Sequence, residues 1–355
     1  MNKPQRLQPG DKIAIVSLSS GILGEPFAKH ELDLLERRLN ELGLDFVYMD
    51  NAKKGMEYLK AHPEARAADL VQAFKDKSAK AVWTVIGGDD TFRTLPYLMN
   101  DEFKQLVAEN PKIFIGFSDT TTNHLMFYKL GLKTYYGPSL FADLAELGPE
   151  ILPYTKEWIY ELFEPTEGKE VTISPVWYSE RTSFGEDQLG VPRVENEETH
   201  GFEFFGEGTI EGELLGGCLE SLYEMLEYGR YEEQKEVFEK FPIFPEREEW
   251  KGKILFVETS EERPTPEKYE KMLMALENRG VFDEVVAIIA GKPQDEVYYD
   301  EYKAILARFA EKYNLPFVYN LNFGHAAPRL ILPYGQKMRI DFGNRKINLV
   351  EEVVG

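Results

Sequence analysis

The sequence contains almost no cysteine. Cys218 is the single cysteine among 355 residues, so the chain can form neither an internal disulfide nor a metal site built from several cysteines. This composition fits a reducing compartment, although secreted bacterial proteins are also often poor in cysteine.

Positive charge and long hydrophobic runs are scarce as well. The chain has 41 lysine and arginine residues against 62 aspartate and glutamate residues, a net charge of −21, which repels nucleic-acid phosphates and anionic membranes. Residues 1–11 lack the apolar centre of a signal peptide, and no run of about 18 apolar residues occurs in the sequence. We therefore expect a cytoplasmic protein that binds neither nucleic acid nor membranes.

The rest of the composition is that of a globular protein. Apolar residues make up 43% of the chain and aromatic residues 13%, which is enough to form a substantial buried core. A chain of this length usually folds into about two domains.

Strand and helix patterns alternate through the first half. Short apolar runs at 12–16, 46–49 and 81–86 are separated by segments with helical spacing at 25–42 and 63–74. This order predicts a parallel sheet covered on both faces, with ligands bound beyond the carboxyl ends of the strands.

The periodic pattern is lost from about Val171 to Gly208, and strand and helix signals return afterwards, with a clear strand at 253–257. An irregular segment of this length is usually a functional loop or a linker. We expect an N-terminal α/β domain at 1–170, a linker or substrate loop at 171–207 and a smaller C-terminal α/β domain at 208–355.

Ser118 occupies the most informative position. The buried-strand pattern of 112–115 ends at Gly116, and helix-forming residues begin at Asp119. A serine on such a turn projects its hydroxyl away from the sheet, above the first amides of the helix, which can stabilise an oxyanion. The elbow pattern G-x-S-x-G is incomplete because Thr120 replaces its second glycine, so the match is weak without an accompanying base and acid.

Histidine is the usual base for a hydroxyl nucleophile. The chain has five: His30, His62, His124, His200 and His325. The first two lie in polar, surface-type segments. His124 is on the helix after Ser118 and points away from the turn, so it is expected to be a packing or surface residue. His200 lies in the irregular loop, where it is solvated or contacts substrate. His325 differs, because Gly324 and Pro328 constrain its loop, as a catalytic base requires. Taken alone, however, a histidine in a loop is more often structural than catalytic.

Glu258 is the best-placed candidate acid. It ends the apolar strand at 254–257, so its carboxylate is expected at the tip of a buried strand, where it can orient a histidine. A charged residue that simply ends a strand explains the pattern equally well.

Several motifs occur in one order along the chain. They are Gly10-Asp11-Lys12-Ile13, Ile86-Gly87-Gly88-Asp89, Gly116-Phe117-Ser118-Asp119-Thr120, Tyr136-Gly137-Pro138, Gly212-Glu213-Leu214-Leu215-Gly216-Gly217, the Glu258 segment, and Gly324-His325 followed by Leu332-Pro333-Tyr334-Gly335. Together they resemble the LD-carboxypeptidase family of serine peptidases, which includes the microcin C self-immunity peptidases. The resemblance covers nearly the whole chain.

The resemblance implies an α/β fold. The N-terminal domain is expected to be Rossmann-like and glutamine-amidotransferase-like, with a parallel sheet and a nucleophile elbow, and the C-terminal domain to contain a β-barrel-like sheet. No metal and no cofactor are expected. The family's tendency to form homodimers is carried over as part of the resemblance.

The resemblance also implies a triad of Ser118, Glu258 and His325. Ser118 is expected to attack the scissile carbonyl, His325 to take and return its proton, and Glu258 to hold the imidazole. The implied oxyanion hole consists of the backbone amides of Gly88 and Asp119.

Two residues depart from the family pattern and bear on the substrate. Cys218 stands where many relatives have an asparagine near the substrate carboxylate, and it is either a packed side chain or a reactive thiol. Glu262, four residues after Glu258, stands where the immunity enzymes that bind aspartyl-adenylate have a lysine. A carboxylate there repels an acidic aminoacyl group and attracts an amine, such as that of diaminopimelate or lysine.

The loop at 171–207 favours a different substrate. Its length and its aromatic residues resemble those of the immunity enzymes, in which a loop aromatic stacks on a nucleobase. Trp177 and Phe184 are candidates for this contact, although loop aromatics more often pack the loop against the protein.

We therefore expect a serine carboxypeptidase that hydrolyses an amide bond next to a free carboxylate. Peptide tails of muropeptides are the favoured substrate, and peptidyl- or aminoacyl-nucleotides are the alternative. A general α/β-hydrolase esterase is a second enzymatic hypothesis, weakened by the missing elbow glycine and by an acid and base in a separate domain. A non-catalytic protein that binds a small ligand at Gly87-Gly88 is a third, but neither G-x-G-x-x-G nor a P-loop is present.

Overall fold

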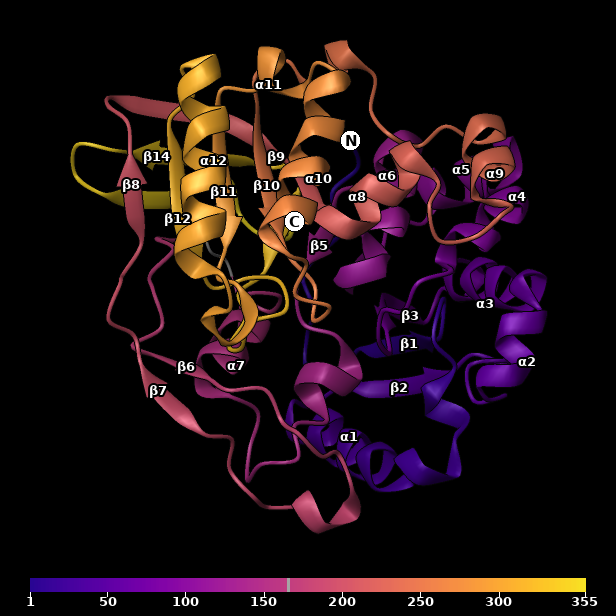
Figure 1. Ribbon diagram of the computed structural model, residues 1–355. Helices are drawn as coiled ribbons and strands as arrows, with labels where there is room; N and C mark the ends of the chain where they lie inside the picture. Colours follow the sequence, from indigo (N-terminus) through magenta and orange to yellow (C-terminus); the bar gives the residue numbers. More distant parts are fainter. Residues whose placement is uncertain (165–166) are drawn as a thin grey trace.

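The computed structural model describes residues 1–164 and 167–355. Two large sheets, each flanked by helices, form the body of the molecule (Figure 1). The helices are α1 (Lys29–Glu41), α2 (Met56–Ala61), α3 (Pro63–Lys75), α4 (Leu95–Leu98), α5 (Asp101–Glu109), α6 (Thr121–Leu130), α7 (Pro153–Tyr160), α8 (Leu219–Glu227), α9 (Gln234–Lys240), α10 (Pro266–Asn278), α11 (Val281–Glu284) and α12 (Tyr299–Tyr313). No helix formed by these residues is both long and apolar enough to cross a membrane.

The first sheet has the strand order β13-β5-β4-β3-β1-β2. Its strands are β1 (Lys12–Val16), β2 (Asp45–Tyr48), β3 (Ala79–Thr84), β4 (Ile113–Gly116), β5 (Thr134–Tyr136) and β13 (Leu332–Tyr334). Strands β1 to β5 are parallel, whereas β13 runs antiparallel to β5. The central strands are apolar and buried on both faces, as a parallel sheet between helices requires. The predicted parallel sheet of the first half is confirmed.

The second sheet has the order β15-β14-β9-β10-β11-β12-β8. Its strands are β8 (Glu203–Phe205), β9 (Thr209–Cys218), β10 (Lys253–Glu258), β11 (Ala287–Gly291), β12 (Phe317–Leu321), β14 (Lys337–Asp341) and β15 (Lys346–Leu349). Strands β9 to β12 are parallel, and antiparallel strands extend both edges. Helices α10 and α12 lie over one face of this sheet (Figure 1). The predicted α/β class is confirmed, and the sheet of the second half, which was predicted to be β-barrel-like, is curled.

The segment 171–207 is largely irregular but contains short strands that the sequence did not reveal. Strands β6 (Val176–Tyr178) and β7 (Glu195–Glu197) form a small separate sheet. Between them the chain descends to α1 (Figure 1), where the ring nitrogen Nε2 of His30 lies 2.9 Å from the backbone oxygen of Phe184. Strands of three residues are too short to show a period of two, so the pattern could not predict them.

The predicted helix at 25–42 begins later than expected. Two 3-10 turns, Ile22–Gly24 and Pro26–Ala28, precede α1. Proline removes a backbone donor and constrains the residue before it, which favours an interrupted entry over a continuous helix.

Candidate active site

Ser118 lies on a strained turn at the end of β4. The strand ends at Gly116, a 3-10 turn spans Ser118–Thr120, and α6 follows at once. Ser118 has a φ of +65°, a conformation that side-chain-bearing residues rarely adopt. Such strain concentrates at functional positions, and here it directs the hydroxyl into a pocket.

The structure brings together the three side chains that were predicted to form a triad. Ser118 Oγ lies 3.0 Å from Nε2 of His325, and Nδ1 of His325 lies 2.7 Å from Oε2 of Glu258. Glu258 ends β10 and comes from the second sheet, whereas Ser118 follows a strand of the first. In this order, the imidazole can remove the proton of the hydroxyl as the hydroxyl oxygen attacks a carbonyl, and the carboxylate orients the imidazole.

Tyr136 connects the nucleophile turn to the acid. Its hydroxyl donates to Oε1 of Glu258 at 2.6 Å and accepts from the backbone N–H of Ser118 at 3.2 Å. The sequence placed Tyr136 in a motif but gave it no role, because its contact with Glu258 depends on how the two sheets meet.

The loop that carries His325 is braced by Arg329. The guanidinium donates from Nε to the carbonyl of Gly324 at 2.5 Å, from Nη2 to the carbonyl of His325 at 2.7 Å and from Nη1 to Asp143 at 2.7 Å. Gly324 has a φ of +89°, and a Cβ there would stand 2.5 Å from the Glu258 carboxylate. Only glycine therefore allows the close approach of loop and acid.

A second carboxylate, Glu261, contacts the imidazole. Its Oε2 lies 3.0 Å from Nε2 of His325, on the side of the ring that also faces Ser118. Burial opposes protonation of His325, but Glu258 and Glu261 outweigh this effect and raise its pKa to about 10. The raised pKa favours the imidazolium, and the Glu261 carboxylate occupies Nε2, the nitrogen that must accept the proton of Ser118. The Glu261 side chain is 64% exposed and has room to withdraw.

The acid itself stays ionised. Burial acts to raise the pKa of Glu258, but the charge of His325 and hydrogen bonds from His325 and Tyr136 outweigh it and hold the pKa below its usual range. A buried carboxylate that accepts several hydrogen bonds in this way can stabilise an imidazolium.

The predicted oxyanion donors, Gly88 and Asp119, each follow a residue of a close contact between Gly87 and Ser118. The N–H of Gly88 donates to no acceptor among the described residues. A Cβ built on Gly87 would stand 3.0 Å from Ser118 Oγ and 3.3 Å from the nitrogen of Asp119. Because Gly87 has no side chain, its backbone can approach Ser118 this closely.

The Asp119 carboxylate helps to hold this arrangement. It accepts hydrogen bonds from the hydroxyl of Ser19 at 2.7 Å and from the N–H of Thr91 at 2.9 Å. Burial raises the pKa of Asp119 to about 6. Its side chain thus ties the turn to neighbouring loops.

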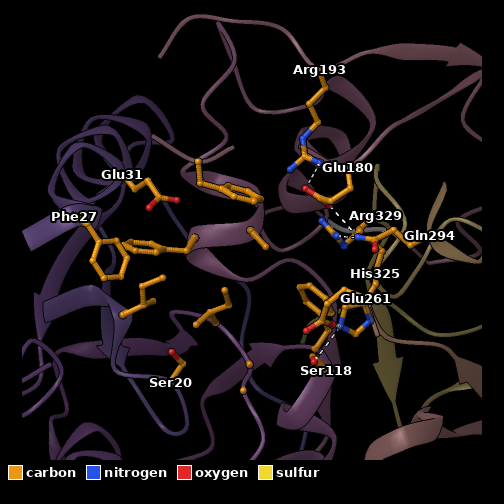
Figure 2. Close-up of a pocket in the computed structure, with 18 of the residues that line it drawn as sticks. Ser20, Phe27, Glu31, Ser118, Glu180, Arg193, Glu261, Gln294, His325 and Arg329 are labelled. Carbon is orange, nitrogen blue, oxygen red and sulfur yellow. Dashed lines mark hydrogen bonds and ion pairs between the residues drawn. The ribbon is translucent and has the colours of Figure 1, made fainter. Parts of the chain in front are cut away.

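The pocket has a volume of about 660 Å³. In Figure 2, Ser118, His325 and Glu261 lie on one side of the cavity, and Phe27 and Glu31 face them from the other. The lining residues are Ser20, Ile22, Phe27, Glu31, Ile86, Gly87, Gly88, Phe117, Ser118, Phe141, Ala142, Glu180, Phe184, Gly185, Arg193, Glu261, Gln294, His325 and Arg329. The cavity is large enough for a short peptide or a nucleotide.

Both arginines of the lining already have carboxylate partners. Arg193 pairs with Glu146 at 2.6 Å and with Glu180 at 3.0 Å, and Arg329 pairs with Asp143. Among the guanidinium nitrogens of the two, only Nη2 of Arg193 makes no hydrogen bond within the described chain. It is available to an anionic group of a ligand.

The predicted substrate residues lie at different places. Phe184 lines the pocket. Trp177 does not, and its ring lies 5.2 Å from Nζ of Lys292 instead. Glu262 is also outside the lining, where it pairs with Arg230 at 2.6 Å. Its neighbour Glu261, to which the sequence assigned no role, faces the pocket in its place.

Cys218 is buried behind the triad rather than in the lining. Its thiol lies 3.4 Å from Glu220, and burial raises its pKa well above the ordinary value. Its sulfur and the ligand atoms of Glu258 and His325 lie within 4.8 Å of one another. A neutral thiol and a carboxylate already bonded to the imidazole are poor metal ligands, so we assign no metal to this group.

The other histidines lie outside the lining. His124 is buried, with Nε2 donating to the carbonyl of Gly116 at 2.9 Å and Nδ1 accepting from Thr134 at 2.7 Å. Burial lowers the pKa of His124 to about 4, so it packs as a neutral ring against the end of β4. His200 stacks on Tyr299.

Comparisons with known proteins agree with these features. Family sequence profiles described as the LD-carboxypeptidase N-terminal domain and the LD-carboxypeptidase C-terminal domain match residues 13–137 and 211–340. The chain is 29% identical to the "Microcin C7 self-immunity protein MccF" of Escherichia coli, covering 81% of this chain and 78% of that one. It is 28% identical to a "Probable murein peptide carboxypeptidase" of Bacillus subtilis, covering 94% and 90%.

A similar solved structure is that of an MccF-like protein from Streptococcus pneumoniae in complex with AMP. It is 47% identical to this chain and superposes with a TM-score of 0.91, covering 96% of this chain and 98% of that one.

Proposed function

The chain belongs to the LD-carboxypeptidase family of serine peptidases, and we propose that Ser118, His325 and Glu258 are its catalytic triad. The observation that carries the proposal is the unbroken contact from Ser118 Oγ through His325 to Glu258, at 3.0 and 2.7 Å, at one side of a pocket of about 660 Å³. The strained backbone of Ser118 and the close approach of Gly87 to it support the same role.

The reaction proceeds by acyl transfer. Ser118 Oγ attacks the carbonyl carbon of a substrate amide while its proton moves to Nε2 of His325, and the N–H groups of Gly88 and Asp119 receive the oxyanion. His325 then protonates the leaving nitrogen and the C–N bond breaks. Water, deprotonated by the same imidazole, hydrolyses the acyl-enzyme, and the proton returns to Ser118. Glu258 stabilises the imidazolium in both steps.

Before the first step, Glu261 must leave Nε2 of His325. Its exposed side chain and the position of its carboxylate in the lining support a movement that accompanies substrate entry. The pKa of His325 then falls, because one of the two carboxylates that raise it is removed.

Ser118→Ala tests the mechanism. The variant is expected to fold normally and to lose turnover. Ser20→Ala, which alters another serine of the same lining, is the matched control and is expected to retain it. Hydrolysis by Ser118→Ala at the wild-type rate excludes Ser118 as the nucleophile.

The proposed substrate is a peptide tail of muropeptide type, cleaved at an amide next to a free carboxylate. The similarity to a murein peptide carboxypeptidase supports this class. Arg193 Nη2 is available to a substrate carboxylate, and the remaining arginine nitrogens of the lining are occupied. Glu31 and Glu261, two carboxylates of the lining with no lysine or arginine partner, oppose a substrate with a further acidic side chain.

An aminoacyl-nucleotide is the second candidate. It is favoured by the phenyl ring of Phe184, which lines the pocket from the loop and can stack on a base. The similar Streptococcus pneumoniae protein was solved in complex with AMP. Mass spectrometry of the purified protein incubated with a tetrapeptide muropeptide and with an aspartyl-adenylate peptide, side by side, distinguishes the two.

We further propose a homodimer and a cytoplasmic location. The family resemblance supports the first, and the sparse cysteine content supports the second. Light scattering combined with size-exclusion chromatography tests the dimer, and fractionation of cells that express the protein tests the location.

A further inference from the structure

Glu31 is a buried carboxylate without a partner in the pocket wall. It lies in the first turn of α1 and is 7% exposed. Figure 2 shows its carboxylate at the cavity, opposite Ser118 and His325. Within residues 1–164 and 167–355 it makes no hydrogen bond and no ion pair.

Each of the other charged side chains of the lining has a partner. Glu180 contacts Arg193 and accepts from Gln294, Glu261 contacts His325, and Arg329 pairs with Asp143. Buried polar groups in folded proteins are nearly always hydrogen-bonded, whereas the carboxylate of Glu31 opens onto the cavity without a partner among the described residues. A ligand that supplies the missing partner is the simplest account of Glu31.

The start of a helix does not by itself explain this side chain. A carboxylate in the first turn is favoured by the helix dipole, but a side chain that faced solvent would gain the same benefit without desolvation. Burial instead raises the pKa of Glu31 to about 7, against a weaker opposing effect of His30. The free-energy cost of removing the Glu31 carboxylate from water therefore arises from its position in the pocket.

The surroundings of Glu31 favour a cation. Ile22, Phe27 and Phe184 line the pocket with it and present apolar surface. In apolar surroundings an ion pair is stronger than in water, whereas a neutral donor leaves the negative charge uncompensated. An ammonium group on a hydrocarbon chain matches both the charge and the apolar walls.

We propose that Glu31 binds an ammonium group of the substrate, at the side of the pocket opposite the scissile bond. The proposal rests on the proposed peptidase function and specifies its substrate as an amine-bearing peptide. The sequence suggested Glu262 for such a contact, but Glu262 pairs with Arg230 outside the lining.

The test compares Glu31→Gln with the wild type on three forms of the tetrapeptide L-Ala-γ-D-Glu-L-Lys-D-Ala: unmodified, Nα-acetylated and Nε-acetylated. For the wild type, acetylation of the recognised amine is expected to raise KM about 10- to 100-fold, the range for a charged hydrogen bond. For the unmodified peptide, Glu31→Gln should raise KM by a similar factor. For the peptide whose recognised amine is acetylated, the same substitution should leave KM unchanged. The value of kcat should not change. Thermal denaturation should show the variant to be at least as stable as the wild type, because it removes an uncompensated buried charge.

Two results overturn the proposal. One is a wild-type KM that neither acetylation changes. The other is a Glu31→Gln variant that weakens binding of AMP as much as binding of the unmodified peptide, since Glu31 would then contact neutral donors of a nucleoside.

Calorimetry on Ser118→Ala, with and without Glu31→Gln, separates this proposal from the proposed function. Binding of the unmodified peptide that depends on Glu31, with no hydrolysis by the wild type, refutes the peptidase function and leaves the ammonium site standing. Hydrolysis without a difference between unmodified and acetylated peptides refutes the ammonium site alone.

Discussion

The contact between Glu261 and His325 predicts a specific change in the pH dependence of the reaction. A base catalyst must be neutral, so kcat/KM rises with pH through the pKa of the imidazole in the free enzyme. Glu261 stabilises the protonated form from 3.0 Å and is among the groups that raise the pKa of His325 to about 10. Glu261→Gln removes this charge, so the rising limb of the profile should move to lower pH.

The size of the shift is limited by solvent. The Glu261 side chain is 64% exposed, and ion pairs with an exposed partner contribute only about 1 kcal/mol or less. Because one pH unit corresponds to about 1.4 kcal/mol, the limb should move by at most roughly 0.7 pH unit. On that limb, kcat/KM should therefore rise by up to about fivefold. Glu258 remains in contact with Nδ1 of His325 and continues to raise the pKa of the imidazole.

The assay is a series of kcat/KM measurements from about pH 5 to 10, with Glu262→Gln as the matched control. Glu262→Gln changes the same charge one residue further along, but its carboxylate pairs with Arg230 and lies outside the pocket. Its profile should coincide with that of the wild type. Equal shifts in both variants would show a general charge effect. An unshifted profile for Glu261→Gln would show that Glu261 does not influence the pKa of His325.

Two further variants probe the surroundings of the triad. Tyr136→Phe removes the hydroxyl that joins Glu258 to the N–H of Ser118. A steady-state assay should show kcat lowered about tenfold, the equivalent of ~1.4 kcal/mol, with KM unchanged. An unchanged kcat would show that the proposed triad holds its geometry without this link. Cys218 is buried with a raised pKa, so iodoacetamide should not inactivate the native enzyme, and Cys218→Ala should retain its kcat. Rapid alkylation that abolishes activity would contradict the packing role.

Parts of the site were predictable because they lie where elements end. Ser118 and Glu258 each follow an apolar run that becomes a buried strand, β4 and β10. Residues at the carboxyl ends of parallel strands gather at one edge of a sheet, so their positions carry information even in a single sequence. His325 was a candidate because glycine and proline constrain the chain around it, but its place in a triad came from the family resemblance.

The remaining contacts depend on which elements become neighbours. Tyr136 reaches Glu258 from the other sheet, and no local pattern encodes that approach. Two adjacent residues of one turn also have different surroundings, because Glu261 faces the pocket whereas Glu262 pairs with Arg230. Arg263, the next residue, has a φ of +48°, a backbone conformation that composition does not predict.

The position of His325 in the chain argues that the proposed triad is formed before substrate arrives. Strand β12 belongs to the second sheet and β13 to the first, so the connecting segment 322–331 is anchored to both. Separation of the two sheets would strain this segment and would break the bonds of Tyr136 with Glu258 and of Arg329 with Asp143. The groups of the proposed triad therefore need not be assembled by closure of the two halves.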